Sequence, residues 1–594
     1  MHRAGALRRS ILSTASRRPR ATRPSQWVRH TSSGPSPAGA SSKSPRGGWG
    51  LGLIPVLVIS AGAGWYLYPN SVGGTDSATK PKGDAAAKQS EKQRLKEATP
   101  VEEDRALLSA QHIQIQKSWE NPGVYAWGSN AGRVVAPDSS DAVIKTPRRI
   151  PFFDGMLLRD LKIDRNFGVA VTEEGDIVQW GTAFAPNTTV PVKTLTGKDI
   201  TKVAVSSDRI IALSRGGTVF SFPVAKSDQQ AAGQKSPSTS WIPFWSGGAS
   251  DSINYRILTP PSLGWREKVV DVRSGLEHCL LLTSSGRVFS AASSTAGFPS
   301  KGQLGIPGLT WLTKPEGPYD QPHLVQGLPR IKQIATGNYH SLALGDKNSQ
   351  VHAWGDNSAG QLGFELDPEN PGIDSPTAVP LEKLYKTNND AGSALSVHSV
   401  AAGGSNSYFT IDSAKPAAQD TWACGEGLYG SLGTGKWAHL TSVPAKVKGL
   451  SGLSEYDDAT RRMVPIRVRH LSVGSTHAAA VLGNATSAQG RTTSSSTPTN
   501  WGSDVLWWGG NEFYQLGTGK RSNLNEPAHI APLDVGGGNS SARAAAVASG
   551  NAGRLQLTPR ATVRIGEGGR GRKVSLEQRI ECGRYATAVY SATA

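Results

Sequence analysis

Three histidines are the residues whose type and spacing first point to chemistry. His278, His340 and His477 each lie three residues after a glycine and begin a short, mostly apolar run. Three imidazoles can bind zinc, so a metal site is one interpretation. Because each histidine occupies the same position in a copied phrase, we instead predict a local structural hydrogen bond in three separate units and no bound metal.

Two Gly-Thr-Gly-Lys segments, at 433–436 and 517–520, resemble pieces of a phosphate-binding loop. A complete loop continues from its lysine to Ser or Thr, whose hydroxyl binds magnesium. Trp437 and Arg521 stand there instead, so we predict no nucleotide site. The stretch GEGGRGRK at 566–573 could contact RNA phosphates through its charge, but we favour a solvated linker and do not expect a nucleic-acid partner.

Other catalytic signatures are missing from the sequence. It contains no H-E-x-x-H, G-x-S-x-G or dinucleotide-binding motif. Cys279, Cys424 and Cys582 fall in different units without a paired spacing, so neither a zinc site nor a disulfide framework is indicated. We therefore predict a protein that is not an enzyme and that holds no cofactor.

The elements that position these residues form a repeat. Residues 335–363 read ATGNYHSLALGDKNSQVHAWGDNSAGQLG, and weaker copies occur near 274–305, 402–435 and 473–519. A full copy contains an apolar strand, a turn, a strand ending in an aromatic residue and glycine, and often a loop ending in Leu-Gly; two units have Phe220-Ser221 and Phe289-Ser290 in place of Trp-Gly. Short strands with glycine turns at regular spacing favour a radial arrangement of sheets. The residues expected to build the repeat are Trp127, Gly128, Trp180, Gly181, His278, His340, Trp354, Gly355, Trp422, His477, Trp508 and Gly509.

The number of hairpins predicts a closed ring. Six start near Leu161, Lys202, Val269, Lys332, Val397 and Val468, and a seventh near Val574 stops before its last strand. Residues 124–128 supply a strand that has no hairpin before it. We therefore expect an all-β fold over residues 123–594, a seven-bladed β-propeller closed by pairing of its N- and C-terminal strands.

This phrasing resembles the regulator of chromosome condensation repeat family, over roughly residues 123–592. His340, Trp354-Gly355 and the Gly-Gln-Leu-Gly run at 360–363 carry the closest match. The resemblance implies a seven-bladed propeller and a partner protein. The activity best known in the family is guanine-nucleotide exchange on a small GTPase. With its leader and apolar segment, the chain also resembles a fungal-type mitochondrial inner-membrane member associated with assembly of respiratory complex III.

The N-terminal residues predict a mitochondrial address. Residues 1–48 hold ten of the 64 Lys and Arg residues and no acid, and the remaining chain has 54 basic against 46 acidic residues. We interpret 1–33 as a transit peptide and 34–48 as a basic linker. The uncharged stretch 49–68 is long enough for a single transmembrane helix in the inner membrane. Its flanking charges slightly favour a propeller in the intermembrane space over the matrix.

Between the apolar stretch and the repeats, residues 69–122 predict a polar, partly helical stalk or a docking helix. Inserts interrupt the repeats at 226–264, 484–503 and 534–573. The first contains Trp241, Phe244 and Trp245, which either touch a membrane or partner or fold back onto their own blade. Loops on a rigid scaffold often carry function.

The predicted function is a membrane-anchored scaffold in assembly or stability of a mitochondrial inner-membrane complex. The partners would be subunits or assembly factors of that complex, and the resemblance implies that the complex is respiratory complex III. Two alternatives stay open: nucleotide exchange on a mitochondrial GTPase, and association with the mitochondrial ribosome.

Overall fold

The computed structural model describes residues 110–594 except for 231–252, 386–395, 414–417, 458–460, 485–486, 489–498, 534–553, 567–569 and the single positions 296, 311, 314, 315, 348 and 501. The predicted transit peptide, basic linker and transmembrane stretch lie outside the described residues, as do Trp241, Phe244 and Trp245. Nearly all regular structure in the described part is β-strand.

The first and last described strands belong to the largest sheet. Its nine strands are β1 (Val124–Ser129), β2 (Val143–Arg149), β3 (Leu158–Ile163), β4 (Gly168–Thr172), β5 (Ile177–Trp180), β6 (Val192–Lys193), β32 (Ala561–Arg564), β33 (Lys573–Cys582) and β34 (Ala586–Thr593).

Four antiparallel sheets of four strands follow one another along the chain. They are β7 (Ile200–Val205), β8 (Arg209–Ser214), β9 (Val219–Pro223) and β10 (Arg256–Ile257); β11 (Val269–Ser274), β12 (His278–Thr283), β13 (Val288–Ala292) and β14 (His323–Leu324); β15 (Ile331–Thr336), β16 (His340–Gly345), β17 (Val351–Asp356) and β18 (Gly372–Ala378); and β19 (Ser396–Gly403), β20 (Asn406–Ser413), β21 (Ala418–Glu426) and β22 (Leu440–Lys446).

A five-stranded sheet and two small hairpins complete the strands. The sheet contains β25 (Val468–Val473), β26 (His477–Leu482), β29 (Ser503–Gly509), β30 (Leu524–Ala528) and β31 (Gln556–Leu557), and the hairpins pair β23 (Ser454–Asp457) with β24 (Arg462–Pro465) and β27 (Ser487–Ala488) with β28 (Thr499–Asn500). The helical elements are α3 (Ala110–Glu120), α4 (Lys226–Gln230) and the single turns η1 (Pro151–Phe153), η2 (Leu381–Leu384) and η3 (Lys448–Leu450).

The burial of each strand follows from its place in its sheet. In the sheet β15–β18, every residue of β16 and β17 is buried, whereas β18 is half-buried or exposed. Middle strands have neighbouring sheets against both faces, so their sequences are apolar on both faces instead of alternating. This is why the repeat reads as short apolar runs and not as amphipathic strands.

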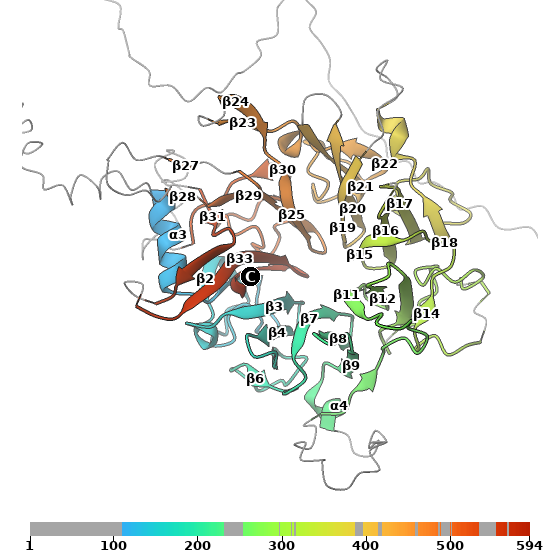
Figure 1. Ribbon diagram of the computed structural model, residues 1–594, viewed down its shortest axis with the longest axis horizontal. Coiled ribbons are helices and arrows are strands. Elements are labelled where there is room, and N and C mark those ends of the chain that lie inside the picture. The colour runs from blue at the N-terminus through green and yellow to red at the C-terminus, as the bar shows by residue number, and fades with distance from the viewer. Residues whose placement is uncertain are drawn as a thin grey trace, which may run out of the picture. The chain divides into compact units, whose positions relative to one another are not determined.

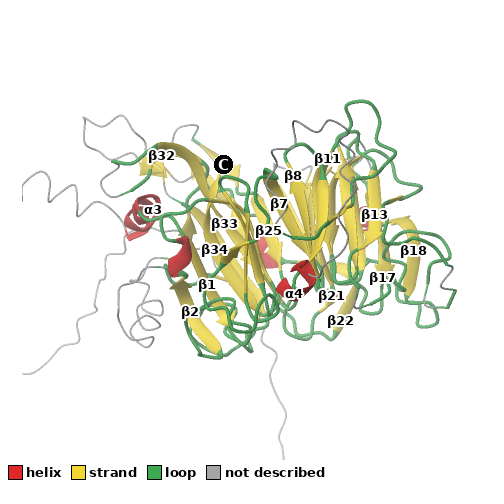
Figure 2. Ribbon diagram, turned by 90° about the horizontal axis from the view of Figure 1, so that it is seen from below, coloured by secondary structure: helices red, strands yellow, loops and turns green. Residues whose placement is uncertain are grey.

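The first strands of successive sheets lie next to one another around a central space. β3 contacts β7, and the contacts continue through β11, β15, β19, β25 and β33, which again contacts β3. Figure 1 shows these strands nearest the middle, with the later strands of each sheet further out. The loops gather at the two ends of the strands (Figure 2). The described residues thus have the radial arrangement of a β-propeller.

The expected fold class is wrong in its details. The strands do not form seven equivalent blades: they assort into sheets of nine, five, four and two strands, and each sheet is open. β34 pairs antiparallel with β1, from Val124–Tyr590 to Gly128–Ala586, and makes one parallel pair with β3. Because β34 hydrogen-bonds to the first strands of the chain, units counted separately along the sequence merge into one sheet.

The transmembrane part of that fold class is not supported either. Within the described residues, none of the helices has the length and apolar character needed to cross a bilayer. The longest described helix, α3, instead packs against β31 and β32. Ile115 of this helix is 1% exposed, and the Ser118 hydroxyl lies 2.5 Å from the Thr558 hydroxyl.

Candidate functional site

A cavity of about 600 Å³ occupies the central space. Residues of β3, β7, β11, β15, β19, β25 and β33 line it. Its charged side chains come from β3, β7, β11, β25 and β33, and the wall made by β15 and β19 is neutral, with Gln333 and Ser399 in the corresponding places. One side of the cavity is therefore ionic and the other side small and uncharged.

In six of the seven inner strands a β-bulge aims one side chain at this cavity. The pairing of the first two strands shifts register at the same point in six sheets. Bulges re-aim side chains in this way. The residue just after each shift is one of the set Asp160, Lys202, Asp271, Gln333, Ser399 and His470.

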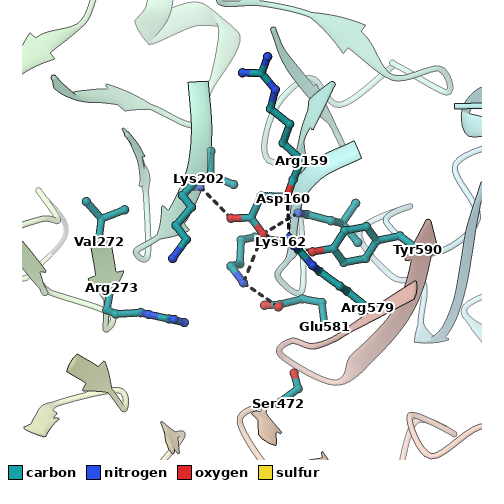
Figure 3. Close-up of polar contacts among 12 residues, drawn as sticks. Arg159, Asp160, Lys162, Lys202, Val272, Arg273, Ser472, Arg579, Glu581 and Tyr590 are labelled. Carbon is teal, nitrogen blue, oxygen red and sulfur yellow. Dashed lines mark hydrogen bonds and ion pairs between the residues drawn. The ribbon is translucent and has the colours of Figure 1, made fainter. Parts of the chain in front are cut away.

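Lys162 and Glu581 form an ion pair in the cavity. The Lys162 Nζ lies 2.7 Å from Glu581 Oε2 and 3.9 Å from Asp160 Oδ1 (Figure 3). Burial lowers the pKa of the Lys162 ammonium, but Glu581 and Asp160 outweigh burial and raise this pKa. Burial raises the pKa of the Glu581 carboxyl, although Lys162 opposes that change. Each partner is thus costly to bury alone.

Arg273 and Lys202 share one carboxylate. Lys202 Nζ lies 2.9 Å from Asp271 Oδ1, and Arg273 Nε lies 3.4 Å from Asp271 Oδ2. Burial raises the pKa of the Asp271 carboxyl, but Arg273 and Lys202 outweigh burial and lower this pKa. The Arg273 and Lys202 side chains both extend into the central space (Figure 3).

His470 is neutral among cations. Burial, together with the positive charges of Arg273, Lys162 and Arg579, lowers the pKa of its imidazole to about 4, whereas Glu577 opposes them. The effect of the three cations means that the electrostatic potential at His470 is positive.

The three repeated histidines do not line this cavity; each links two neighbouring sheets. His278 Nε2 lies 2.9 Å from Ser341 Oγ, Ser341 Oγ lies 3.2 Å from the Gln303 carbonyl oxygen, and Trp354 Nε1 lies 3.0 Å from that oxygen. The indole and the hydroxyl both donate to the carbonyl. We therefore assign the proton of the neutral imidazole to Nε2, which donates to the hydroxyl.

The same chain of hydrogen bonds recurs at His477. Its Nε2 lies 2.7 Å from Thr587 Oγ1, which donates to the Gln515 carbonyl at 2.7 Å, and Trp127 Nε1 reaches that carbonyl at 2.8 Å. His340 Nε2 likewise lies 2.9 Å from Ser407 Oγ. The nearest partner of each histidine thus lies in the next unit, and no cluster of His, Cys, Asp or Glu in the described residues could hold a metal ion.

One repeat departs from the aromatic pattern in a way the sequence concealed. β20 pairs Asn406 with Gly425 just as β16 pairs His340 with Gly355, so Cys424, not Trp422, is the counterpart of Trp354. The Cys424 Sγ lies 3.6 Å from the Gln361 carbonyl, where four other units place the indole of Trp127, Trp180, Trp354 or Trp508. Trp422 is half-buried and donates instead to the Tyr385 hydroxyl at 2.9 Å.

The remaining repeat residues lie in the buried strands. Trp127, Trp180, Trp354 and Trp508 have no exposed surface. The glycines that follow them, Gly128, Gly181, Gly355 and Gly509, all have φ between 100° and 112°, a backbone conformation that favours glycine.

An aromatic rim of half-buried side chains stands on the face where the first two strands of each sheet are joined. We define it as Phe513, Tyr514 and Tyr585; the Phe513 and Tyr585 rings lie 5.0 Å apart, and Arg165 lies over Tyr585. Tyr514 and Tyr585 both have φ of 63°. In other units the position of Tyr514 is held by glycine, as at Gly360 and Gly430.

Two family models match the middle of the chain. Both describe the regulator of chromosome condensation (RCC1) repeat, one at residues 286–344 and the other at 331–361. This part of the chain carries RCC1 repeats. The matched residues include His340, Trp354 and the β15–β17 strands, so the RCC1 family assignment made from the sequence is confirmed.

Relatives with RCC1 repeats include two proteins whose names place them in mitochondria. "Protein FMP25, mitochondrial" of Saccharomyces cerevisiae is 25% identical over 68% of this chain and 64% of its own length. "RCC1 domain-containing protein RUG3, mitochondrial" of Arabidopsis thaliana is 25% identical over 60% of this chain and 71% of its own length. The chain thus spans slightly less than two thirds of the yeast relative.

Solved RCC1-type structures share the fold. Yeast RCC1 (Prp20), in its structure bound to Kap60, gives a TM-score of 0.50 at 17% identity, covering 82% of this chain and 93% of the other. Human WBSCR16 gives a TM-score of 0.50 at 16% identity, covering 80% and 99%. At these identities the likeness supports the RCC1 propeller architecture alone.

The charged cavity of this RCC1 propeller was missed by the sequence reasoning. In β3, β7 and β11 its charged residues lie two or four positions after the first apolar residue of the strand, as Asp271 and Arg273 follow Val269. A charged residue in an otherwise apolar first strand was the available signal. Using this signal required the knowledge that the first strands of all the sheets face one shared space.

Proposed function

We propose that this protein is a non-enzymatic, protein-binding propeller scaffold that acts in mitochondria. The observation that carries the proposal is the aromatic rim. Tyrosine at positive φ costs about 1–3 kcal/mol, and such strain often marks binding surfaces. Large aromatic side chains beside cations are also the groups that dominate the energetics of protein interfaces.

Two observations support the mitochondrial address. The two relatives described above are mitochondrial by name, and the first 48 residues of this chain carry ten basic residues and no acid. We propose further that the client is an inner-membrane complex. Respiratory complex III is the specific candidate, and it rests on the family resemblance alone.

The test is loss of function followed by rescue. Removing the protein should lower assembled complex III on native gels while the other respiratory complexes are largely kept, and the wild-type chain should restore it. Uniform loss of mitochondrial translation products would instead favour action on the ribosome. An unchanged level of complex III would refute this client.

The rim itself is tested by Tyr514→Gly. Glycine accepts the positive φ without strain, so the variant should be as stable as the wild type but should restore less assembled complex III. The matched control is Arg133→Gly, which changes another non-glycine residue with positive φ (53°) in a different loop. Equal rescue by both variants would refute a binding role for the rim.

A second candidate is guanine-nucleotide exchange on a mitochondrial GTPase. "Secretion-regulating guanine nucleotide exchange factor" of Bos taurus is 27% identical over 40% of this chain and 49% of its own length. Exchange requires a surface that presses on the nucleotide site of the GTPase and no catalytic triad. Purified protein should then accelerate release of bound GDP from such a GTPase, and no acceleration across the mitochondrial GTPases would remove this candidate.

A further inference from the structure

We propose that the central cavity binds a small oxyanion with two negative charges, either a phosphate or a dicarboxylate, held by Arg273 together with Lys202 and His470. This proposal is independent of the scaffold function and of the aromatic rim. It rests on hydrogen-bond donors that face the cavity and for which the described residues supply too few acceptors.

Arg273 is the central donor because most of its hydrogen-bonding capacity is unused. A guanidinium has five N–H donors, and the ion pair of Arg273 within the described part of the chain runs through Nε, at 3.4 Å to Asp271. The side chain is 41% exposed although strands surround it, so its terminal nitrogens face water inside the cavity. A planar fork of this kind binds phosphate or carboxylate through two parallel hydrogen bonds.

The cavity acids do not repel an anion strongly, because basic side chains already pair with them. Asp271 is 2.9 Å from Lys202, Glu581 is 2.7 Å from Lys162, and Glu577 is 2.7 Å from Arg579. Six basic residues and five acids line the cavity, not counting His470. The wall therefore has a small excess of positive charge.

His470 adds a neutral donor at a place of positive potential. Among the described residues no hydrogen bond to its ring is found, and Arg273, Lys162 and Arg579 make the potential there positive. One ring N–H can donate to a bound oxyanion, and the negative charge of that ion would relieve the repulsion between the cations.

The opposite wall leaves room for the ion. Gln333 is held by the β19 backbone, with its Nε2 donating to the Val400 carbonyl at 2.8 Å. Ala335, Ala401 and Ser399 are small and line the same side of the cavity. No charged side chain from β15 or β19 lines the cavity to compete for Arg273.

The experiment is isothermal titration calorimetry on the purified full-length protein. Inorganic phosphate and succinate are titrated separately at constant ionic strength, with sodium chloride as the reference. We expect saturable binding of at least one of the two, and which one binds identifies the class of oxyanion. Heat that does not saturate, or that sodium chloride reproduces, would overturn the proposal.

The deciding variant is Arg273→Gln. Losing one charge-assisted, two-point contact should weaken binding about tenfold or more. The matched control is Arg266→Gln, at an exposed arginine stacked on Trp265 outside the cavity, which should leave the affinity unchanged. Equal affinities of both variants would refute the assignment.

Should Arg273→Gln fail to fold by circular dichroism, Arg273→Lys takes its place. Lysine keeps the charge but not the planar fork, so affinity should fall severalfold while folding is kept. Unchanged affinity in Arg273→Lys would show that Arg273 does not hold the ion through its fork.

Discussion

Acid should unfold this propeller through the histidines that link its sheets. Burial lowers the pKa of His278 to about 3, of His340 to about 4 and of His477 to about 3, from an ordinary value of 6.5. The Nδ1 atoms of all three are buried and have no hydrogen-bond partner. A second proton would therefore create a buried cation with an unpaired N–H group.

The direction of this pH dependence follows from the linkage between proton binding and folding. Because the folded pKa values are depressed, the unfolded chain binds protons first as the pH falls below 6.5. The stabilisation by each neutral histidine is complete above that pH and is lost toward the folded pKa. At pH 5 the unfolded chain gains about 1.4 kcal/mol for each pH unit below 6.5. This amounts to about 2 kcal/mol per histidine and about 6 kcal/mol for the three.

The assay is urea unfolding followed by circular dichroism at pH 7, 6 and 5. His340→Asn is the test variant, since Asn406 holds the equivalent position of the next unit. The substitution itself can lower the free energy of unfolding at pH 7. Between pH 7 and pH 5, however, the free energy of unfolding of the variant should fall by about 2 kcal/mol less than that of the wild type. His439→Asn, at an exposed histidine, is the control. If His340→Asn kept the full wild-type pH dependence, the neutral buried imidazole would be refuted.

Three further outcomes are expected. Lys162→Met should destabilise the protein by about 3 kcal/mol because it leaves Glu581 buried and unpaired, and adding Glu581→Met should recover most of that loss in a double-mutant cycle of urea midpoints. Gly425→Ala should lower the free energy of unfolding by more than about 2 kcal/mol, because φ is 118° and a Cβ would overlap the Ser405 carbonyl. The matched control is Gly197→Ala, at φ of 70° with open space around it, which should lower the free energy of unfolding by about 1 kcal/mol. The three thiols are free and buried, so a thiol reagent should label none in the native protein and all three in urea; labelling before unfolding would contradict their burial.

The β-rich repeat was predictable from the sequence because its signal is local. In the copy at 335–363, the glycines, the buried middle strands and the pairing of His340 with Gly355 all lie within one short stretch of sequence. The glycine after each tryptophan could be anticipated, because the strand bulges there and only glycine accepts the required φ without strain. The family assignment followed from the same local features.

The features that failed depend on distant residues. Counting hairpins predicted the pairing of β1 with β34. It could not show that β34 also pairs with β3, at Leu158–Ala592, which merges two units into one sheet. Cys424 was overlooked because Trp422 lies two residues away and only the strand register distinguishes their roles. The ionic cavity likewise required charged strands from four sheets to face one space.

The pairing of Val124 with Tyr590 also determines when the propeller can complete its folding. A strand near the start of the propeller must stay without its partner until nearly the whole polypeptide has emerged from the ribosome or an import channel. Contacts so far apart in sequence form slowly and leave apolar edges open meanwhile. We expect nascent or partly imported chains to depend on chaperones until the last strand arrives, and a chain shortened by its final eight residues to stay trapped in that dependent state.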